Sequence, residues 1–183
     1  MIDPPAPRSL LISGLERRHA RRLSTDAADL ALLRRVLPFL PDHPDPRALA
    51  LVAAYCGATR PAQDAALLTA SLWAIHHRVT PPRASMWNLG RALRAAPASA
   101  AERAWLRLTT ASDATLPRAA AASVAVLTAN GIATDWHRLY RDLRSWHQGS
   151  REVVLRRWCT GLFGPLHSGE ADFPPPRSSE VST

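Results

Sequence analysis

Lysine is missing from this sequence, so every permanently charged basic side chain is an arginine. A GC-rich coding bias exchanges lysine for arginine and is one explanation of that choice, but it does not explain the excess of positive charge. The 23 basic residues outnumber the 15 acidic ones, which gives a formal net charge of +8. The segment after Gly164 contains one arginine and three acids, so the rest of the chain has 22 arginines against 12 acids, near +10. A basic body of this size favours a polyanionic partner, most often nucleic acid, and an anionic membrane surface is the main alternative.

Sequence motifs for catalysis and for metal binding are also missing. The chain has no Walker loop, G-x-S-x-G, G-x-G-x-x-G or H-E-x-x-H motif. His76 and His77 are adjacent, and neighbouring helical residues point about 100° apart, so they do not ligate one metal from a regular helix. The acids fit helix caps or surface partners, and no two carboxylates share a helix face; examples are Asp26, Asp64, Glu102 and Asp135. We therefore expect no enzymatic activity, no metal and no cofactor.

Cysteine is scarce, and only Cys56 and Cys159 are present. Each stands in an apolar helical context without metal-ligand spacing, so we expect two small buried residues in a reducing compartment. The first residues have no basic stretch before a brief apolar run, which argues against a signal peptide and a transmembrane span. The expected location is the cytoplasm.

The sequence is poor in glycine and in runs of β-branched residues, and it lacks long apolar–polar alternation. Alanine, leucine and arginine are abundant instead, which predicts an all-α protein. Apolar periodicity, caps and prolines predict about nine helices, over residues 8–23, 26–37, 47–56, 61–78, 86–96, 100–110, 115–130, 135–147 and 151–163.

Several helix boundaries are predicted from local signals. Pro61 begins one helix, and Asn130-Gly131 ends another. Expected N-caps are Thr25 or Asp26, Ser99 in a capping box with Glu102, Thr134, and Ser150. The break near Pro97 predicts two packed helical lobes, residues 1–97 and 98–164. Residues 165–183 have almost nothing to bury and are expected to be a disordered tail.

The stretch "DWHRLYRDLRSWH", residues 135–147, combines aromatic and basic side chains. Its apolar residues recur at steps of three and four, the spacing of one helix face. Its arginines fall off that face, so the segment is predicted to be buried on one side and positive on the other. The tryptophans of the chain also fit apolar stripes, and we expect Trp136 and Trp158 to be core residues; base stacking by one or two tryptophans is the alternative.

Five pieces of the sequence occur in an order and spacing known from one protein family: "ALLRRVL", "NLGRALR", "AERAWLRL", "GIATDWHRLYRDLRSW" and "RRWCTGLF". Any one of them is a weak signal, but five in order over most of the chain are fairly specific. From about residue 30 to residue 163 the chain resembles the CasB family, the small subunits of type I-E CRISPR surveillance complexes (Cascade).

The resemblance implies an all-helical subunit without enzymatic activity. Two copies would lie side by side in the complex, against the other Cascade subunits that carry the guide RNA. Their basic surface would hold the displaced single-stranded DNA and stabilise the guide–target hybrid, while guide pairing supplies sequence readout. A free-standing basic helical protein that binds a protein or an anionic membrane is the alternative, and an enzyme of unknown type comes third.

Candidate nucleic-acid-binding residues follow from the resemblance and from the arginine distribution. They are Arg34, Arg35, Arg60, Arg91, Arg103, Arg107, Arg118 and Arg151. Arg35, Arg60 and Arg151 stand where the family has basic residues near nucleic acid, and Arg103 matches the first arginine of the family's "ERR". Ala104 and Ala121 replace two arginines of the family pattern, which suggests that binding surface has moved to Arg107 or Arg118. Gly90 is expected to let two helices approach closely, and Arg91 beside it has a structural alternative.

Overall fold

The fold is all-helical in the computed structural model, which describes residues 12–13, 26–40, 42–76 and 87–165. No strand occurs within these ranges. The helices are α2 (Asp26–Val36), α3 (Pro46–Ala53), α4 (Arg60–His76), α5 (Leu89–Arg94), α6 (Ala98–Thr109), α7 (Leu116–Ala129), α8 (Trp136–Ser145) and α9 (Arg151–Phe163). Two short elements complete the order, the 3-10 turn η1 (Leu37–Phe39) and the π-helical turn η2 (Trp146–Ser150).

The all-α prediction is confirmed, but the number of helices is lower than the predicted nine. The helix expected over residues 8–23 falls almost entirely outside the described residues. The last two expected helices are joined, because η2 carries the chain from α8 into α9 across a kink at Gly149, whose φ is 88°. With α8 and α9 counted as one bent segment, the described ranges contain seven separate helical segments.

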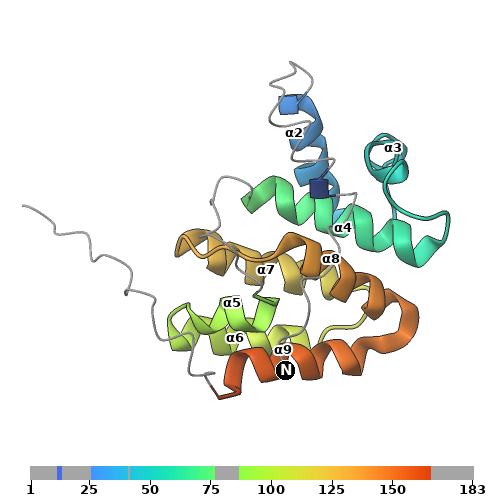
Figure 1. Ribbon diagram of the computed structural model, residues 1–183. Coiled ribbons are helices and arrows are strands. Elements are labelled where there is room, and N and C mark those ends of the chain that lie inside the picture. The colour runs from blue at the N-terminus through green and yellow to red at the C-terminus, as the bar shows by residue number, and fades with distance from the viewer. Residues whose placement is uncertain (1–11, 14–25, 41, 77–86, 166–183) are drawn as a thin grey trace, which may run out of the picture.

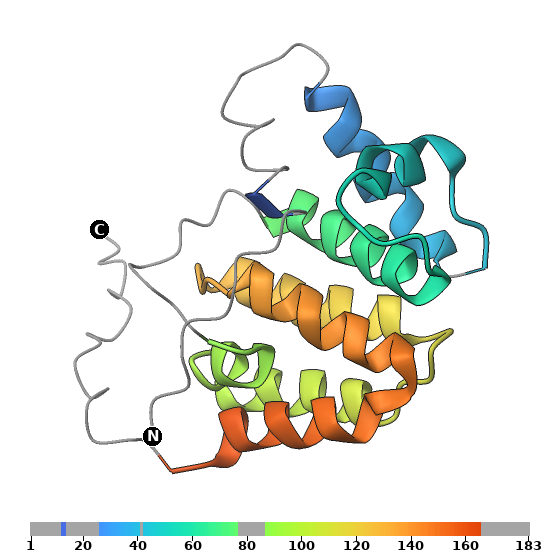
Figure 2. The ribbon, with the colours of Figure 1, turned by 45° about the vertical axis from the view of Figure 1, so that its right-hand side comes forward.

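The helices are arranged in three tiers (Figures 1 and 2). α2 and α3 pack with α4 in the first tier, α7 and α8 form the middle tier, and α5, α6 and α9 form the third. α4 contacts α7 and α8 of the middle tier, so it connects the first tier to the rest of the molecule. Buried residues from all three tiers form one continuous hydrophobic cluster.

α4 is the most buried helix because its sequence, RPAQDAALLTASLWAIH, is rich in alanine and leucine on every side. Every residue from Ala65 to Ala74 is buried, which is typical of a helix surrounded by others. Its two buried hydroxyls differ. Thr69 donates to the Ala65 carbonyl at 2.7 Å, while Ser71 Oγ has no hydrogen-bond partner among the described residues. Small side chains therefore let four neighbouring helices approach α4.

The predicted boundaries are right at two positions and wrong at two others. Pro61 lies in the first turn of α4, and Gly131 follows α7 with a φ of 63°. The Ile132 amide donates to the Leu127 carbonyl at 2.9 Å, the bond expected beyond a glycine-terminated helix. The predicted cap of α8 was wrong, because the Asp135 side chain, not Thr134, accepts the Arg138 amide at 3.0 Å.

The predicted capping box of α6 was also wrong. α6 begins at Ala98, with Pro97 as N-cap and no side-chain cap, so Ser99 and Glu102 lie inside the helix. Ser150 is the N-cap residue of α9 by position, but its side chain makes no cap hydrogen bond. The cap predicted at Thr25 or Asp26 rests on a residue outside the described ranges.

α5 and α9 touch at two glycines, which confirms the close approach predicted at Gly90. A Cβ atom on Gly90 would lie 1.8 Å from the Trp158 carbonyl oxygen, and one on Gly161 would lie 2.3 Å from Asn88 Oδ1. Each helix thus has a glycine where the other needs room. α5 belongs to the expected first lobe and α9 to the second, and the division at residue 97 stays a prediction.

Tryptophan burial follows the predicted stripes. Trp136 and Trp158 are buried, as predicted, and Trp158 stacks on Trp146 with ring centroids 6.0 Å apart.

The two cysteines were predicted to be buried, but Cys56 and Cys159 are both half-buried free thiols. Burial raises the pKa of the Cys56 thiol above its ordinary value, which keeps the thiol protonated at neutral pH.

Candidate nucleic-acid interface

Arg34 and Arg35 lie in the last turn of α2, but their environments differ. Arg34 Nε donates to the Ala74 carbonyl near the end of α4 at 2.8 Å, so this guanidinium helps to fasten α2 to α4. Arg35 is exposed, and it makes no hydrogen bond or ion pair with the residues that the structure describes. Of the two, Arg35 is the more available to a ligand.

Arg60 stands at the first residue of α4, at the other end of the same helix. Its side chain is 80% exposed and its Nε lies 3.6 Å from Asp64 Oδ2, an i,i+4 ion pair of the exposed kind that contributes little. Fourteen residues separate Arg60 from Ala74, or roughly 21 Å along the helix axis. Arg34 and Arg60 are therefore not brought together.

Arg103, Arg107 and Arg118 are exposed on α6 and α7. Arg103 and Arg107 are one helical turn apart and share a face. Each is two residues, or about 200°, from Trp105, whose ring meets Phe163 of α9 with centroids 6.0 Å apart. The two arginines consequently point away from α9, and they form the exposed basic face of α6.

Arg91 and Arg151 are both half-buried against tryptophan rings. The Arg91 guanidinium lies 5.5 Å from the Trp87 ring centroid, and that of Arg151 lies 5.4 Å from the Trp146 ring centroid. Arg151 Nη2 also donates to the Thr109 carbonyl at the end of α6 at 2.5 Å. These contacts give both arginines a structural role, so their substitution would test packing as well as binding.

The turn η2 brings together several elements that are distant in the sequence. Trp146 Nε1 donates to Asp113 Oδ1 in the loop before α7 at 2.9 Å, and α4 packs on η2. The Arg151 contact with Thr109 adds the end of α6. Arg60, Arg107, Arg118 and Arg151 thus belong to chain segments that converge at the η2 end of the molecule, whereas Arg34, Arg35 and Arg91 belong to other parts of it.

His147 lies in η2 and is half-buried, and its buried Nε2 atom has no hydrogen-bond partner within the described part of the chain. Burial lowers the pKa of His147 below its ordinary value, and the carboxylates of Asp64 and Asp113 act in the opposite direction. The protein therefore favours neutral His147.

A pH dependence of stability follows from His147. Because its pKa is lower in the folded state, the unfolded chain binds more protons below about pH 6.5, and stability should fall as the pH decreases through that value. The melting temperature of wild type should drop more than that of His147→Gln between roughly pH 7.5 and 5.5. His43→Gln, at an exposed position, should behave like wild type. Parallel curves for wild type and His147→Gln would contradict the assignment.

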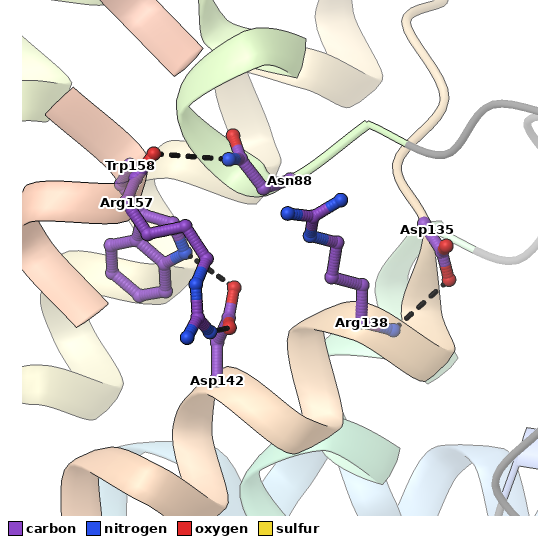
Figure 3. Close-up of polar contacts among 6 residues, drawn as sticks. All are labelled: Asn88, Asp135, Arg138, Asp142, Arg157 and Trp158. Carbon is purple, nitrogen blue, oxygen red and sulfur yellow. Dashed lines mark hydrogen bonds and ion pairs between the residues drawn. The ribbon is translucent and has the colours of Figure 1, made fainter. Parts of the chain in front are cut away.

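A buried carboxylate in α8 is a structural feature that the sequence analysis missed. Asp142 is fully buried; its Oδ2 accepts Trp158 Nε1 at 2.8 Å, and its Oδ1 pairs with the Arg157 guanidinium. Figure 3 shows Asp142 pointing from α8 toward these two side chains of α9, and Asn88 donating to the Arg157 carbonyl at 3.0 Å. The carboxylate joins α8 to α9 through fully partnered oxygens. The sequence could have indicated the burial of Asp142, because this residue lies beside Leu139 and Leu143 on the apolar face of the helix.

Unpaired positive charge remains on the surface of the described part of the chain. Within it, Arg35, Arg103, Arg107 and Arg118 have no carboxylate within ion-pair distance. The described ranges contain no group of three or more histidine, cysteine or acidic side chains arranged to hold a metal, and no helix in them is long and apolar enough to cross a membrane. The fold and its surface define an all-helical protein with an exposed, uncompensated basic surface.

The chain belongs to the Cse2 family of CRISPR-associated proteins, whose family model matches residues 29–161. It is similar to the crystal structure of CasB from Thermus thermophilus, with a TM-score of 0.68 and 25% identity, covering 86% of this chain and 99% of that one. A second crystal structure from Thermus thermophilus, of a CRISPR-associated protein of the Cse2 family, is similar with a TM-score of 0.67 and 25% identity, covering 85% and 96%. No curated protein is significantly similar in sequence. The predicted resemblance to the CasB family is confirmed.

Proposed function

We propose that the protein is the non-catalytic small subunit of a type I-E Cascade complex and that its basic surface stabilises the R-loop. Membership of the Cse2 family supports the first part, since the family model covers most of the helical body. The observation that carries the second part is the set of exposed arginines without acidic partners, above all Arg103 and Arg107 on one face of α6. The expected partners are the other subunits, guide RNA, displaced single-stranded DNA and a second copy of the chain.

A basic surface of this kind needs to contribute only a small binding energy to favour the open R-loop. Replacing a DNA duplex by a guide–target hybrid is nearly balanced, so contacts to the backbone of either product shift the equilibrium towards the open R-loop. Exposed guanidinium groups bind phosphate without reading bases. The arginines are thus expected to act at any target sequence, with an affinity that falls as salt rises.

Single and double substitutions on α6 test the nucleic-acid part of the proposal. Each arginine that contacts a phosphate contributes about −0.7 to the slope of log affinity against log salt on single strands. Arg103→Ala with Arg107→Ala should therefore flatten the slope for an oligo(dT) probe by about 1.4. Both positions are exposed, so the melting temperature should stay within a degree or two of wild type. The measurement is a fluorescence titration at several salt concentrations.

Arg47→Ala is the matched control, because Arg47 is equally exposed but lies on α3, in the tier opposite α6 (Figure 1). It removes one charge, half of what the double variant removes, and should leave the slope unchanged instead of flattening it by about 0.7. A wild-type slope near zero, or tighter binding to anionic vesicles than to DNA at equal salt, would favour the membrane-binding alternative. Failure of the chain to co-purify with guide RNA and the other subunits would contradict the proposal that it is a subunit of a type I-E Cascade complex.

A further inference from the structure

The helix pair α8–α9 is the most basic part of the described chain. Residues 136–163 contain six arginines and two acids, a formal charge of +4. One of the two acids, Asp142, is fully buried and paired. Of these six arginines, only Arg151 was among the predicted binding residues. The proposed function therefore assigns no role to the other five.

Arg157 is held in one orientation on this surface. Its Nη1 pairs with Asp142 Oδ1, and Asp142 is itself fixed by the Trp158 indole at 2.8 Å. The side chain of Arg157 is still 41% exposed, so part of it is accessible to a ligand. An arginine whose rotamer is already fixed loses less entropy when it binds a phosphate.

Three further arginines lie close in sequence to Asp142 or Arg157. Arg138 lies one turn before Asp142 on α8, and Figure 3 shows its side chain on the same side of the helix as the Asp142–Arg157 pair. Arg141 and Arg156 are exposed neighbours in sequence of Asp142 and Arg157. Arg138 is half-buried, whereas Arg141, Arg156 and Arg157 are exposed. The contact between Asp142 and Arg157 joins α8 to α9 at the positions next to these arginines, so both helices contribute positive charge to this surface.

The composition of this surface fits a phosphate backbone better than a protein partner. Protein interfaces centre on clusters of exposed apolar side chains. Val153, one turn before Arg157, and Phe163, at the end of α9, are the exposed large apolar residues of this helix pair, so charged side chains outnumber apolar ones on its surface. A phosphodiester backbone needs only charge and hydrogen-bond donors at intervals. The surface also differs from the basic face of α6, because Arg103 and Arg107 point away from α9.

We propose that α8 and α9 form a second phosphate-binding face, in which Arg141, Arg156 and Arg157 contact the backbone of single-stranded nucleic acid and Asp142 positions Arg157. The inference rests on the proposed nucleic-acid function and adds a separate surface to it. Asp142 does not touch the ligand; it acts through Arg157. A strand bound on this face and another on α6 would be held by different sides of the same subunit.

The first experiment uses the full chain and the oligo(dT) probe. Arg141→Ala with Arg156→Ala should flatten the salt slope by about 1.4 and weaken binding about 25-fold at roughly 0.1 M salt relative to its effect at 1 M. Arg47→Ala should have no effect. If the α6 variants weaken binding and the α8–α9 variant does not, the second face is refuted and the proposed function stands. If wild type does not bind at all, the proposed function fails first. Normal DNA binding with loss of co-purified subunits would show instead that this face meets an acidic protein surface.

The second experiment separates positioning from simple structural support. Asp142→Asn keeps the shape of the side chain and an acceptor for Trp158, but it raises the net charge by one. A bystander acid would therefore leave DNA binding unchanged or make it tighter. The positioning role predicts weaker binding, about five-fold at roughly 0.1 M salt, as if one phosphate contact were lost. Binding is measured well below the melting temperature of the variant, and tighter binding by folded Asp142→Asn would overturn the role of Asp142.

Discussion

Gly90→Ala is expected to destabilise the protein by about 3 kcal/mol or more, at the upper end of overpacking substitutions. The new Cβ would lie 1.8 Å from the Trp158 carbonyl oxygen and 2.6 Å from its carbonyl carbon. Both are backbone atoms of α9, so no side-chain rotation relieves the clash and α5 must move away. Chemical denaturation of the variant should show a midpoint far below that of wild type.

Gly57→Ala is the control for this substitution. Gly57 has no heavy atom within 4 Å of the position of an added Cβ, and it is exposed. Alanine should be neutral there, or slightly stabilising because it restricts the unfolded chain. Equal stability of the two glycine variants would show that α5 and α9 do not pack as closely as the structure has them.

The helices after residue 25 were predictable because their signals are local. Apolar residues at steps of three and four, together with Pro61 and Asn130-Gly131, define a helix from a window of a few residues. The close contact at Gly90 was predicted as well, because a glycine inside a helix costs stability and is usually explained by close packing. Its counterpart Gly161 was not, because nothing in the sequence pairs residues seventy positions apart.

The caps show where local signals become ambiguous. Thr134 and Asp135 are adjacent and both suit an N-cap, and the backbone conformation decides in favour of Asp135. Ser99 and Glu102 match a capping box, yet α6 begins before them, at a proline. Propensity alone does not choose between neighbouring residues that can all begin a helix.

The arginines could not be sorted from the sequence, because tertiary contacts determine which of them are free. Arg34 reaches a carbonyl forty residues away, and Arg151 reaches one forty-two residues away. Arg157 is held by Asp142, an acid that looks like a surface residue until α9 packs on it. Composition shows that some arginines stay unpaired, and only the packing shows which.

Trp158→Ala is expected to cost about 3–5 kcal/mol, the range for removing a large buried aromatic side chain. Trp158 is fully buried and stacks on Trp146, so alanine would leave a cavity between α8 and α9. It would also remove the indole donor from the buried carboxylate of Asp142, and a charged acceptor that loses a partner adds to the cost.

Two further variants separate these contributions. Trp158→Phe keeps most of the ring but not the N–H, so it should lose about 1–3 kcal/mol, mainly through Asp142. Trp105→Ala removes a half-buried tryptophan on α6, next to Phe163, and should cost less than Trp158→Ala. The measurement is the free energy of unfolding from denaturant titration, with oligo(dT) binding recorded for each folded variant. A stable Trp158→Ala protein that no longer binds DNA would mean that this indole stacks on bases and is not part of the core.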